Sequence, residues 1–156
     1  MKEFDYDLNY KKLDFTDTET RELYRIGRGE QGVLLVRPYT NIICNHWRFK
    51  TPREAIISSN KIFAMYLDYR DEGDFIGMDM CRKFLEMGFT RARRYANHKD
   101  GKKYNPDRTI KPQEPDALTS DKALSAKIFK NIRDLAAYDE TYQTMRKQWR
   151  ESENAV

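Results

Sequence analysis

The residues best suited to chemistry in this sequence are basic and aromatic side chains that gather in one stretch, "FTRARRYANHKDGKK". Guanidinium groups bind phosphate as planar forks, and aromatic rings stack on bases, so this mixture is typical of phosphate or nucleic-acid recognition. The candidate binding residues are those of this stretch and two arginines nearer the amino end: Arg91, Arg93, Arg94, Tyr95, His98, Lys99, Lys102, Lys103, Arg28 and Arg48. The alternative is structural, because a helix dipole favours cations at the carboxyl end and arginines often close internal ion pairs.

The charge of the chain is unevenly distributed. Residues 82–111 carry ten Lys or Arg against three acidic residues, a local charge of +7, although the formal net charge of the whole chain is only +4. The remaining residues therefore sum to −3. A basic segment on a mildly acidic body produces a focused field, which favours a polyanionic partner such as nucleic acid.

Length and composition indicate one folded domain. A chain of 156 residues can bury one core, and its aromatic content of 13% supplies that core despite a charged fraction of 35%. No apolar run approaches the roughly eighteen residues of a membrane span, so we expect a cytoplasmic protein with no membrane partner. Cys44 and Cys81 lack metal-ligand spacing. We therefore expect reduced thiols, no metal site and no cofactor.

Gly27, Gly29 and Gly32 satisfy the pattern G-x-G-x-x-G of dinucleotide-binding loops. Such a loop follows a strand and opens a helix, whose free amides then bind the pyrophosphate. Here the predicted order is the reverse, with a helix before the glycines and a strand after them. The pattern is therefore interpreted as a glycine-rich connection, although Arg25 and Arg28 beside its amides could form a small anion site.

The predicted fold class is α+β and mostly helical: a small antiparallel hairpin packed on three or more helices, in a single domain spanning residues 1–156. An irregular arm covers about 1–15, and a short helix capped by Thr16 extends through Tyr24. The runs "VLLV" and "IICNHWRF", separated by "RPYTN", predict the hairpin. Alternation along the second strand would place Trp47 in the core and Arg48 on the opposite side.

Helix-start signals are clearest at "TPRE", where Thr51 can act as N-cap, Pro52 as first helical residue and Glu54 as capping-box partner of a helix to about residue 72. Asp74 can cap a second helix, about 75–98, whose first half is apolar and whose second half is basic. A long loop covers about 100–118. The carboxyl-terminal helical region, about 119–151, has a break near Asp139.

Catalytic motifs are scarce, and the sequence leaves open whether the protein is an enzyme. Asp79, between two methionines, is expected to form a partly buried brace with an arginine more readily than to act as a base. The enzyme alternative is a pocket where five arginines bind a phosphorylated small molecule, with Asp79, Glu30 or His98 as acid or base. Those arginines are Arg25, Arg28, Arg48, Arg91 and Arg94. A third hypothesis is a protein partner bound through Tyr142 and Trp149.

Three blocks of the chain, "LYRIGRGEQGVLLV", "HWRFKTPREA" and "DFIGMDMCRKFLEMGFTRARRYANHKDGKKY", resemble an uncharacterised domain of unknown function found in bacteria, tailed bacteriophages and some eukaryotes. The likeness extends from about Phe4 to Trp149. It implies a cytoplasmic single-domain protein and is compatible with a phage origin. It implies no mechanism, because no catalytic residues are established for that family.

Overall fold

A computed structural model of the protein describes residues 2–155, and every named element in that range is a helix. The elements are the 3-10 turn η1 (Tyr10–Lys12) and the α-helices α1 (Thr18–Arg21), α2 (Tyr39–Cys44), α3 (Pro52–Asp71), α4 (Phe75–Asn97), α5 (Asp121–Ala137) and α6 (Glu140–Asn154). The only β-type pairing in residues 2–155 is an isolated antiparallel bridge between Tyr104 and Ile110. No helix in that range has the length and apolar content needed to cross a membrane.

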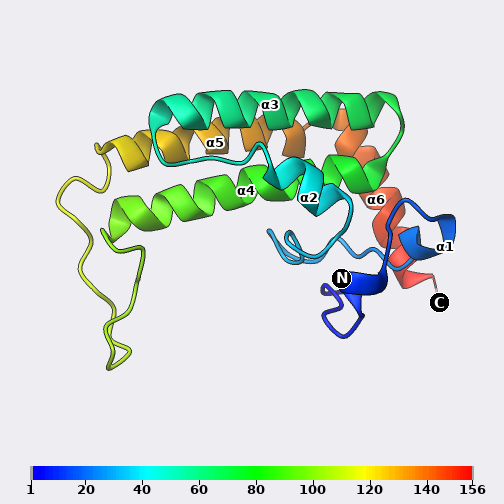
Figure 1. The fold of residues 1–156 in the computed structure, drawn as a ribbon, viewed down its shortest axis with the longest axis horizontal. Helices are drawn as coiled ribbons and strands as arrows, with labels where there is room; N and C mark the ends of the chain where they lie inside the picture. The colour runs from blue at the N-terminus through cyan, green and yellow to red at the C-terminus, as the bar shows by residue number, and fades with distance from the viewer. Residues whose placement is uncertain (1, 156) are drawn as a thin grey trace.

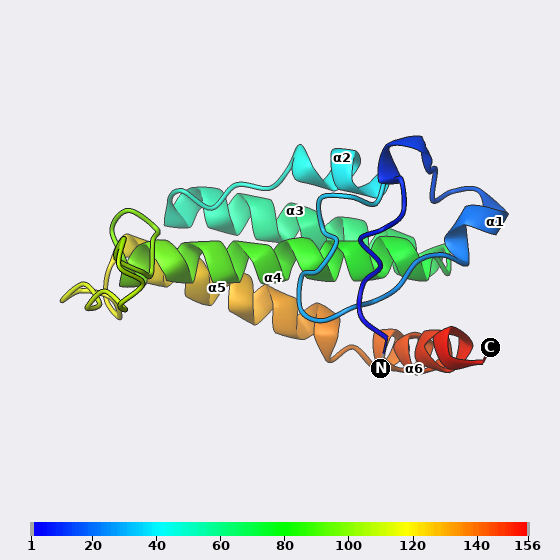
Figure 2. The same cartoon turned by 90° about the horizontal axis from the view of Figure 1, so that it is seen from below.

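The three long helices α3, α4 and α5 lie side by side, and α4 packs against both of the others. Figure 1 shows the long loop between α4 and α5 projecting from one end of this bundle, while α6 and both chain ends lie at the opposite end. We call the end of the bundle from which this loop projects the loop end. The amino-terminal segment crosses over α4 (Figure 2), so the first half of α4 is covered on several sides.

The long helices begin where the sequence predicts. The Thr51 side chain accepts a hydrogen bond from the Glu54 amide at 3.1 Å, and Asp74 accepts one from the Gly77 amide at 3.2 Å. Each cap satisfies an amide that has no partner inside its helix. Ser120 caps α5 in the same way at 3.1 Å. The predicted break near Asp139 is also confirmed, since α5 ends at Ala137 and α6 begins at Glu140.

Two glycines allow the neighbouring helices to approach α4 closely. A Cβ atom at Gly77 would lie 2.4 Å from the ring of Tyr69 in α3, and one at Gly88 would lie 2.4 Å from the ring of Phe129 in α5. Both distances are far below van der Waals contact, so a larger residue would have to displace a packed ring. This packing fixes the position of α4, whose last turns carry the predicted binding residues.

The predicted hairpin, and with it the α+β fold class, is wrong. Residues 31–38 form consecutive turns that lead directly into α2, and "NHWRF" is irregular. The buried residues of this stretch are Val33, Val36, Tyr39, Thr40 and Ile43. Their spacing of three and four matches helical turns, whereas a strand would bury alternate residues. Hydrogen bonding also favours turns here, because the Thr40 hydroxyl donates to the Val33 carbonyl and accepts from the Val36 amide.

The short helix predicted from Thr16 to Tyr24 is limited to the four residues of α1. Thr16 does not cap it: its amide and hydroxyl both donate to the Asp14 side chain, and the N-cap position is Asp17. A local turn therefore competes successfully with the longer helix.

Candidate nucleic-acid interface

The basic half of α4 and the start of the following loop lie at the loop end of the bundle (Figure 1). Four cationic side chains there are exposed, and we call them the basic surface: Arg91, Arg94, Lys99 and Lys102. Tyr95 is exposed as well, with 39% of its surface accessible. Arg91 and Arg94 lie on the closely packed helix α4, which suits guanidinium groups that must hold a fixed orientation, whereas Lys99 and Lys102 follow it in the loop.

Within residues 2–155, the four cations of the basic surface form no ion pair with a carboxylate. Of the ten predicted binding residues, only Arg28 forms an ion pair with a partner in residues 2–155, and that partner is the exposed Glu3 at 3.3 Å. Unpaired surface cations keep their charge available for a partner in solution. The structural alternative, in which the arginines close internal ion pairs, is therefore not what residues 2–155 show.

A first hollow of about 320 Å³ lies between the end of α4 and the loop, and we call it the His98 pocket. Its lining residues are Phe89, Thr90, Arg93, Arg94, Asn97, His98, Lys103, Ile110, Lys111 and Gln113. The lining includes four Lys or Arg side chains and no acidic side chain. His98 is buried, so it cannot serve as the exposed stacking platform that the sequence suggested.

A second hollow of about 430 Å³, the aromatic groove, is lined by Trp47, Arg48, Phe49, Lys50, Tyr95 and Lys122. The ring centroids of Trp47 and Phe49 are 4.9 Å apart, and those of Phe49 and Tyr95 are 6.1 Å apart. Lys122, from α5, lies 5.8 Å from the centroids of both Phe49 and Tyr95. Three rings and three cations thus share one groove whose lining contains no carboxylate.

Hydrogen bonds fix three side chains that line the aromatic groove. The indole N–H of Trp47 donates to the Phe84 carbonyl of α4 at 3.0 Å, and the Lys122 ammonium donates to the Lys50 carbonyl at 2.6 Å. Arg48 donates to the Trp47 carbonyl at 2.6 Å. The first two bonds hold the segment before α3 against the middle of α4 and the first turn of α5, without the strand that the sequence predicted.

The two hollows lie beside the same last turns of α4, because Arg94 lines the His98 pocket and the next residue, Tyr95, lines the aromatic groove. Sequence reasoning found both of these residues but missed Lys50, Lys111 and Lys122. Trp47 was assigned to the core; it packs against the core but is only half-buried, and with the half-buried Phe49 it lines the groove. No sequence signal links Lys122 to them, since the contact depends on how α5 packs.

The glycine-rich segment has a packing role. Gly27, Gly29 and Gly32 have φ values of +69°, +52° and +78°, which glycine adopts most easily. The ring of Phe4 occupies the space beside Gly32, where a Cβ atom would come within 2.1 Å of it. The Arg28 amide donates to the Gln31 side chain at 2.8 Å. The segment is therefore a bend that fastens the amino-terminal arm, and the strand predicted after it does not form.

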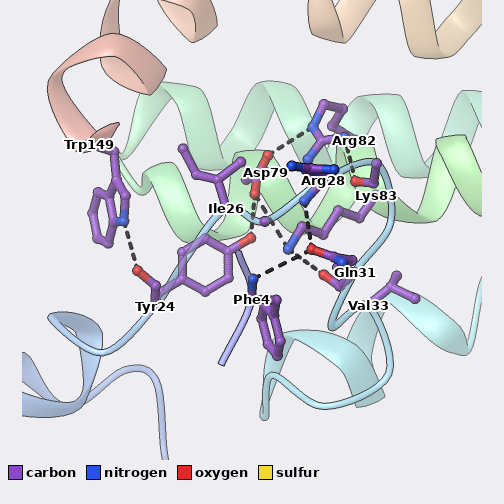
Figure 3. A network of polar contacts seen from close by, with 12 residues as sticks. Phe4, Tyr24, Ile26, Arg28, Gln31, Val33, Asp79, Arg82, Lys83 and Trp149 are labelled. Atoms are coloured by element: carbon purple, nitrogen blue, oxygen red, sulfur yellow. Dashed lines mark hydrogen bonds and ion pairs between the residues drawn. The ribbon is translucent and has the colours of Figure 1, made fainter. Parts of the chain in front are cut away.

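Behind this bend, Asp79 is the centre of a buried polar network (Figure 3). One of its carboxylate oxygens accepts hydrogen bonds from Arg82 at 2.8 Å and from the Tyr142 hydroxyl at 2.5 Å, and the other accepts one from the Tyr24 hydroxyl. The predicted brace between Asp79 and an arginine is confirmed, with Asp79 fully buried. Arg82 also donates to the Gly29 carbonyl at 2.9 Å, which joins the network to the glycine bend.

The ionisation of this network follows from its contacts. Burial raises the pKa of Asp79, but the charges of Arg82 and Lys83 and the hydrogen bonds from Arg82 and Tyr142 outweigh it and lower that pKa to about 2. Burial lowers the pKa of Lys83 to about 7 against the opposing attraction of Asp79. Burial and the Asp79 charge together raise the pKa of Tyr24 and Tyr142. Asp79, Tyr24 and Lys83 are fully enclosed, and their contacts join α4 to the amino-terminal segment, so we interpret this network as structural.

A hollow of about 400 Å³ beside this network, the arginine pocket, is lined by Gly27, Arg28, Gly29, Arg82, Glu86, Arg133, Ala137, Tyr138, Tyr142, Gln143 and Arg146. Most of its cations have carboxylate partners. Arg82 pairs with Asp79, Arg133 pairs with both Glu86 and Asp134, and Arg28 pairs with Glu3. Compensation of this kind leaves little net charge to attract an anion.

Four of the five arginines of the enzyme alternative line three separate hollows. Arg48 lines the aromatic groove and Arg94 lines the His98 pocket, while Arg28 and Arg91 line a separate hollow together with Glu30.

The protein-partner hypothesis requires Tyr142 and Trp149 to lie on the surface, and the structure places both elsewhere. Tyr142 is buried and Trp149 is half-buried, where it stacks on Phe75 with ring centroids 5.3 Å apart. Tyr142 therefore belongs to the core, and Trp149 packs against it.

The fold and the site define a helical protein with a basic and aromatic surface at one end of its bundle. The chain belongs to the family described as domain of unknown function (DUF4385), whose model matches residues 5–152. This confirms the resemblance carried by the three sequence blocks. The chain has no match among curated proteins or among solved structures.

Proposed function

We propose that the protein binds single-stranded nucleic acid at the loop end of its bundle. The observation that carries the proposal is the aromatic groove, in which Trp47, Phe49 and Tyr95 lie beside three cations and no carboxylate. Proteins that bind single strands combine aromatic rings, on which bases stack, with cations that follow the backbone. The basic surface beside the groove supplies further cations for phosphates.

A single strand suits this groove better than a duplex. Bases in a duplex are already stacked and paired, so their faces are not accessible to protein rings, whereas the bases of a single strand are. The proposal includes a cytoplasmic location, where nucleic acid is accessible and where the unpaired Cys44 and Cys81 stay reduced.

The competing function, recognition of a small phosphorylated molecule in the arginine pocket, has weaker support. Three of the four arginines in that pocket have carboxylate partners. The loop end offers cations without such partners, and phosphate contacts depend on available charge. Electrostatics therefore favours the loop end.

Fluorescence anisotropy with labelled single strands of about 12 nucleotides tests the proposal. We expect binding at low salt that weakens steeply as salt rises from about 50 to 200 mM, because phosphate contacts release counterions. A duplex of equal length should bind more weakly than the single strand. Absence of low-salt binding, or an affinity that does not depend on salt, would refute the proposal.

Tyr95→Leu tests the stacking contribution while it keeps an apolar side chain. Stacking is worth about 1–3 kcal/mol per base, so this variant should weaken binding by about fivefold or more. Tyr138→Leu is the matched control, because Tyr138 is 76% exposed and lies outside the groove, at the turn between α5 and α6. Equal losses in the two variants would show that the groove is not the binding site.

A further inference from the structure

The His98 pocket carries more uncompensated charge than a structural role explains. Arg93 and Arg94 come from the last turns of α4, where the helix dipole by itself favours cations. Lys103 and Lys111 come from the loop, which gains nothing from that dipole. Two separate segments therefore bring cations to one hollow, and like charges repel each other unless an anion lies between them.

The groups that contact these cations within residues 2–155 leave most of the charge in place. Arg93 donates to the Asn97 side chain at 3.1 Å and to the Ala117 carbonyl, both of which are neutral. Lys111 is the exception, with an ion pair to Asp100 at 2.7 Å. Arg94 and Lys103 have no ion pair in the described chain.

His98 adds an independent sign of a missing partner. This residue lines the pocket and is only 4% exposed, and its Nδ1 atom is buried without a hydrogen-bond partner in residues 2–155. A buried polar atom without a partner is unfavourable, and such atoms are rare in folded proteins. An oxygen-rich anion in the pocket would provide the partner.

We propose that the His98 pocket binds a phosphate monoester, the terminal phosphate of the strand whose bases stack in the aromatic groove. This inference rests on the proposed function. A terminal phosphate carries about −1.5 to −2 charges at neutral pH, more than the single charge of an internal phosphodiester, and so matches a pocket with several unpaired cations. Arg94 of this pocket and Tyr95 of the aromatic groove are consecutive residues of α4, so a strand that passes around the end of this helix would reach both hollows.

The test compares three labelled oligonucleotides of one sequence, which carry a 5′-phosphate, a 3′-phosphate or hydroxyl groups at both ends. We expect one of the phosphorylated forms to bind about tenfold more tightly than the hydroxyl form, because charge-assisted hydrogen bonds to the terminal group are added. Inorganic phosphate should compete against that form and reduce its advantage, without displacing the hydroxyl form.

Two matched variants test whether the preference for a terminal phosphate arises in the His98 pocket. Arg94→Gln and Arg91→Gln each remove one exposed arginine from the same helix, but only Arg94 lines the His98 pocket. The first should abolish the preference for a terminal phosphate, and the second should weaken all three oligonucleotides equally. Lys103→Gln, a change in the loop, should act like Arg94→Gln.

Equal affinity of the unmodified protein for all three oligonucleotides would overturn this inference and leave the proposed function intact. A terminal-phosphate preference that survives both Arg94→Gln and Lys103→Gln would also overturn it. If none of the three binds, the proposed function itself fails, so the two failures are distinguishable.

Discussion

The ammonium group of Lys83 lies 3.9 Å from the nearest carboxylate oxygen of Asp79, yet it donates its hydrogen bond to the Gln31 carbonyl at 2.6 Å. It also lies 4.9 Å from the ring centroids of both Phe4 and Tyr24. Lys83 is fully buried, so this one side chain joins α4 to the amino-terminal arm inside the core. Its ionisation should therefore affect the stability of the whole fold.

We predict that the free energy of unfolding rises with pH between about 7 and 9. Burial lowers the pKa of Lys83 to about 7, whereas in the unfolded chain it returns to its ordinary value of 10.5. Between these values the unfolded state binds a proton that the folded state does not, so stability increases by up to about 1.4 kcal/mol per pH unit. Urea denaturation at several pH values measures this slope.

Lys83→Met should remove the slope, because methionine does not titrate. Lys127→Met is the matched control: Lys127 is exposed on α5, and its replacement should leave the slope unchanged. If the pH dependence of the free energy of unfolding persists in Lys83→Met, another group causes it and the prediction is wrong.

Asp79→Asn should destabilise the protein by about 3–5 kcal/mol, because it leaves Arg82 as a buried cation without its partner. The loss would be read from chemical denaturation at neutral pH, where Asp79 is ionised. Asp134→Asn offers a comparison, since Asp134 pairs with Lys130 and Arg133 nearer the surface and its loss should cost no more than about 1 kcal/mol. Similar losses in both variants would contradict the central role of Asp79.

Gly88→Ala should destabilise the protein although alanine is the better helix former. The helix preference of alanine is worth about 1 kcal/mol, whereas overpacking against the buried Phe129 ring costs typically about 1–3 kcal/mol. A double-mutant cycle with Phe129→Leu, measured by chemical denaturation, separates the helix preference from the overpacking. In a Phe129→Leu background the clash is relieved, and Gly88→Ala should then become neutral or stabilising. A loss of the same size in both backgrounds would contradict this account of the contact.

The fold was predictable where short-range chemistry decides it. Thr51 and Asp74 cap their helices through their own side chains, and Gly73, with a φ of +70°, separates the two helices. The hairpin was mispredicted because a short apolar run is compatible with a strand or with buried turns. The spacing of Val33, Val36 and Ile43 contained the signal for turns, but the Pro38 and Asn41 signals were interpreted as a hairpin turn.

The site was predictable in part for a related reason. Arg91, Arg94 and Tyr95 lie within one helix, so their common location follows from the sequence. Lys122 comes from α5, and its contact with the aromatic groove depends on packing between distant segments. Burial of His98 likewise depends on the loop that folds over it. Such long-range contacts leave no periodic pattern in a single sequence.

The acidic residues of the loop provide the last prediction, because one of them restrains a cation of the His98 pocket. Asp100→Asn breaks the ion pair with Lys111 and should tighten binding of a single-stranded oligonucleotide by roughly a factor of two to five. Asp107→Asn is the matched control: it removes the same charge from the same loop, but Asp107 contacts Thr109 and no cation in residues 2–155. A general change in net charge would strengthen binding equally in both variants. A larger gain in Asp100→Asn, measured by anisotropy across a range of salt concentrations, would place the added phosphate contact at Lys111 itself.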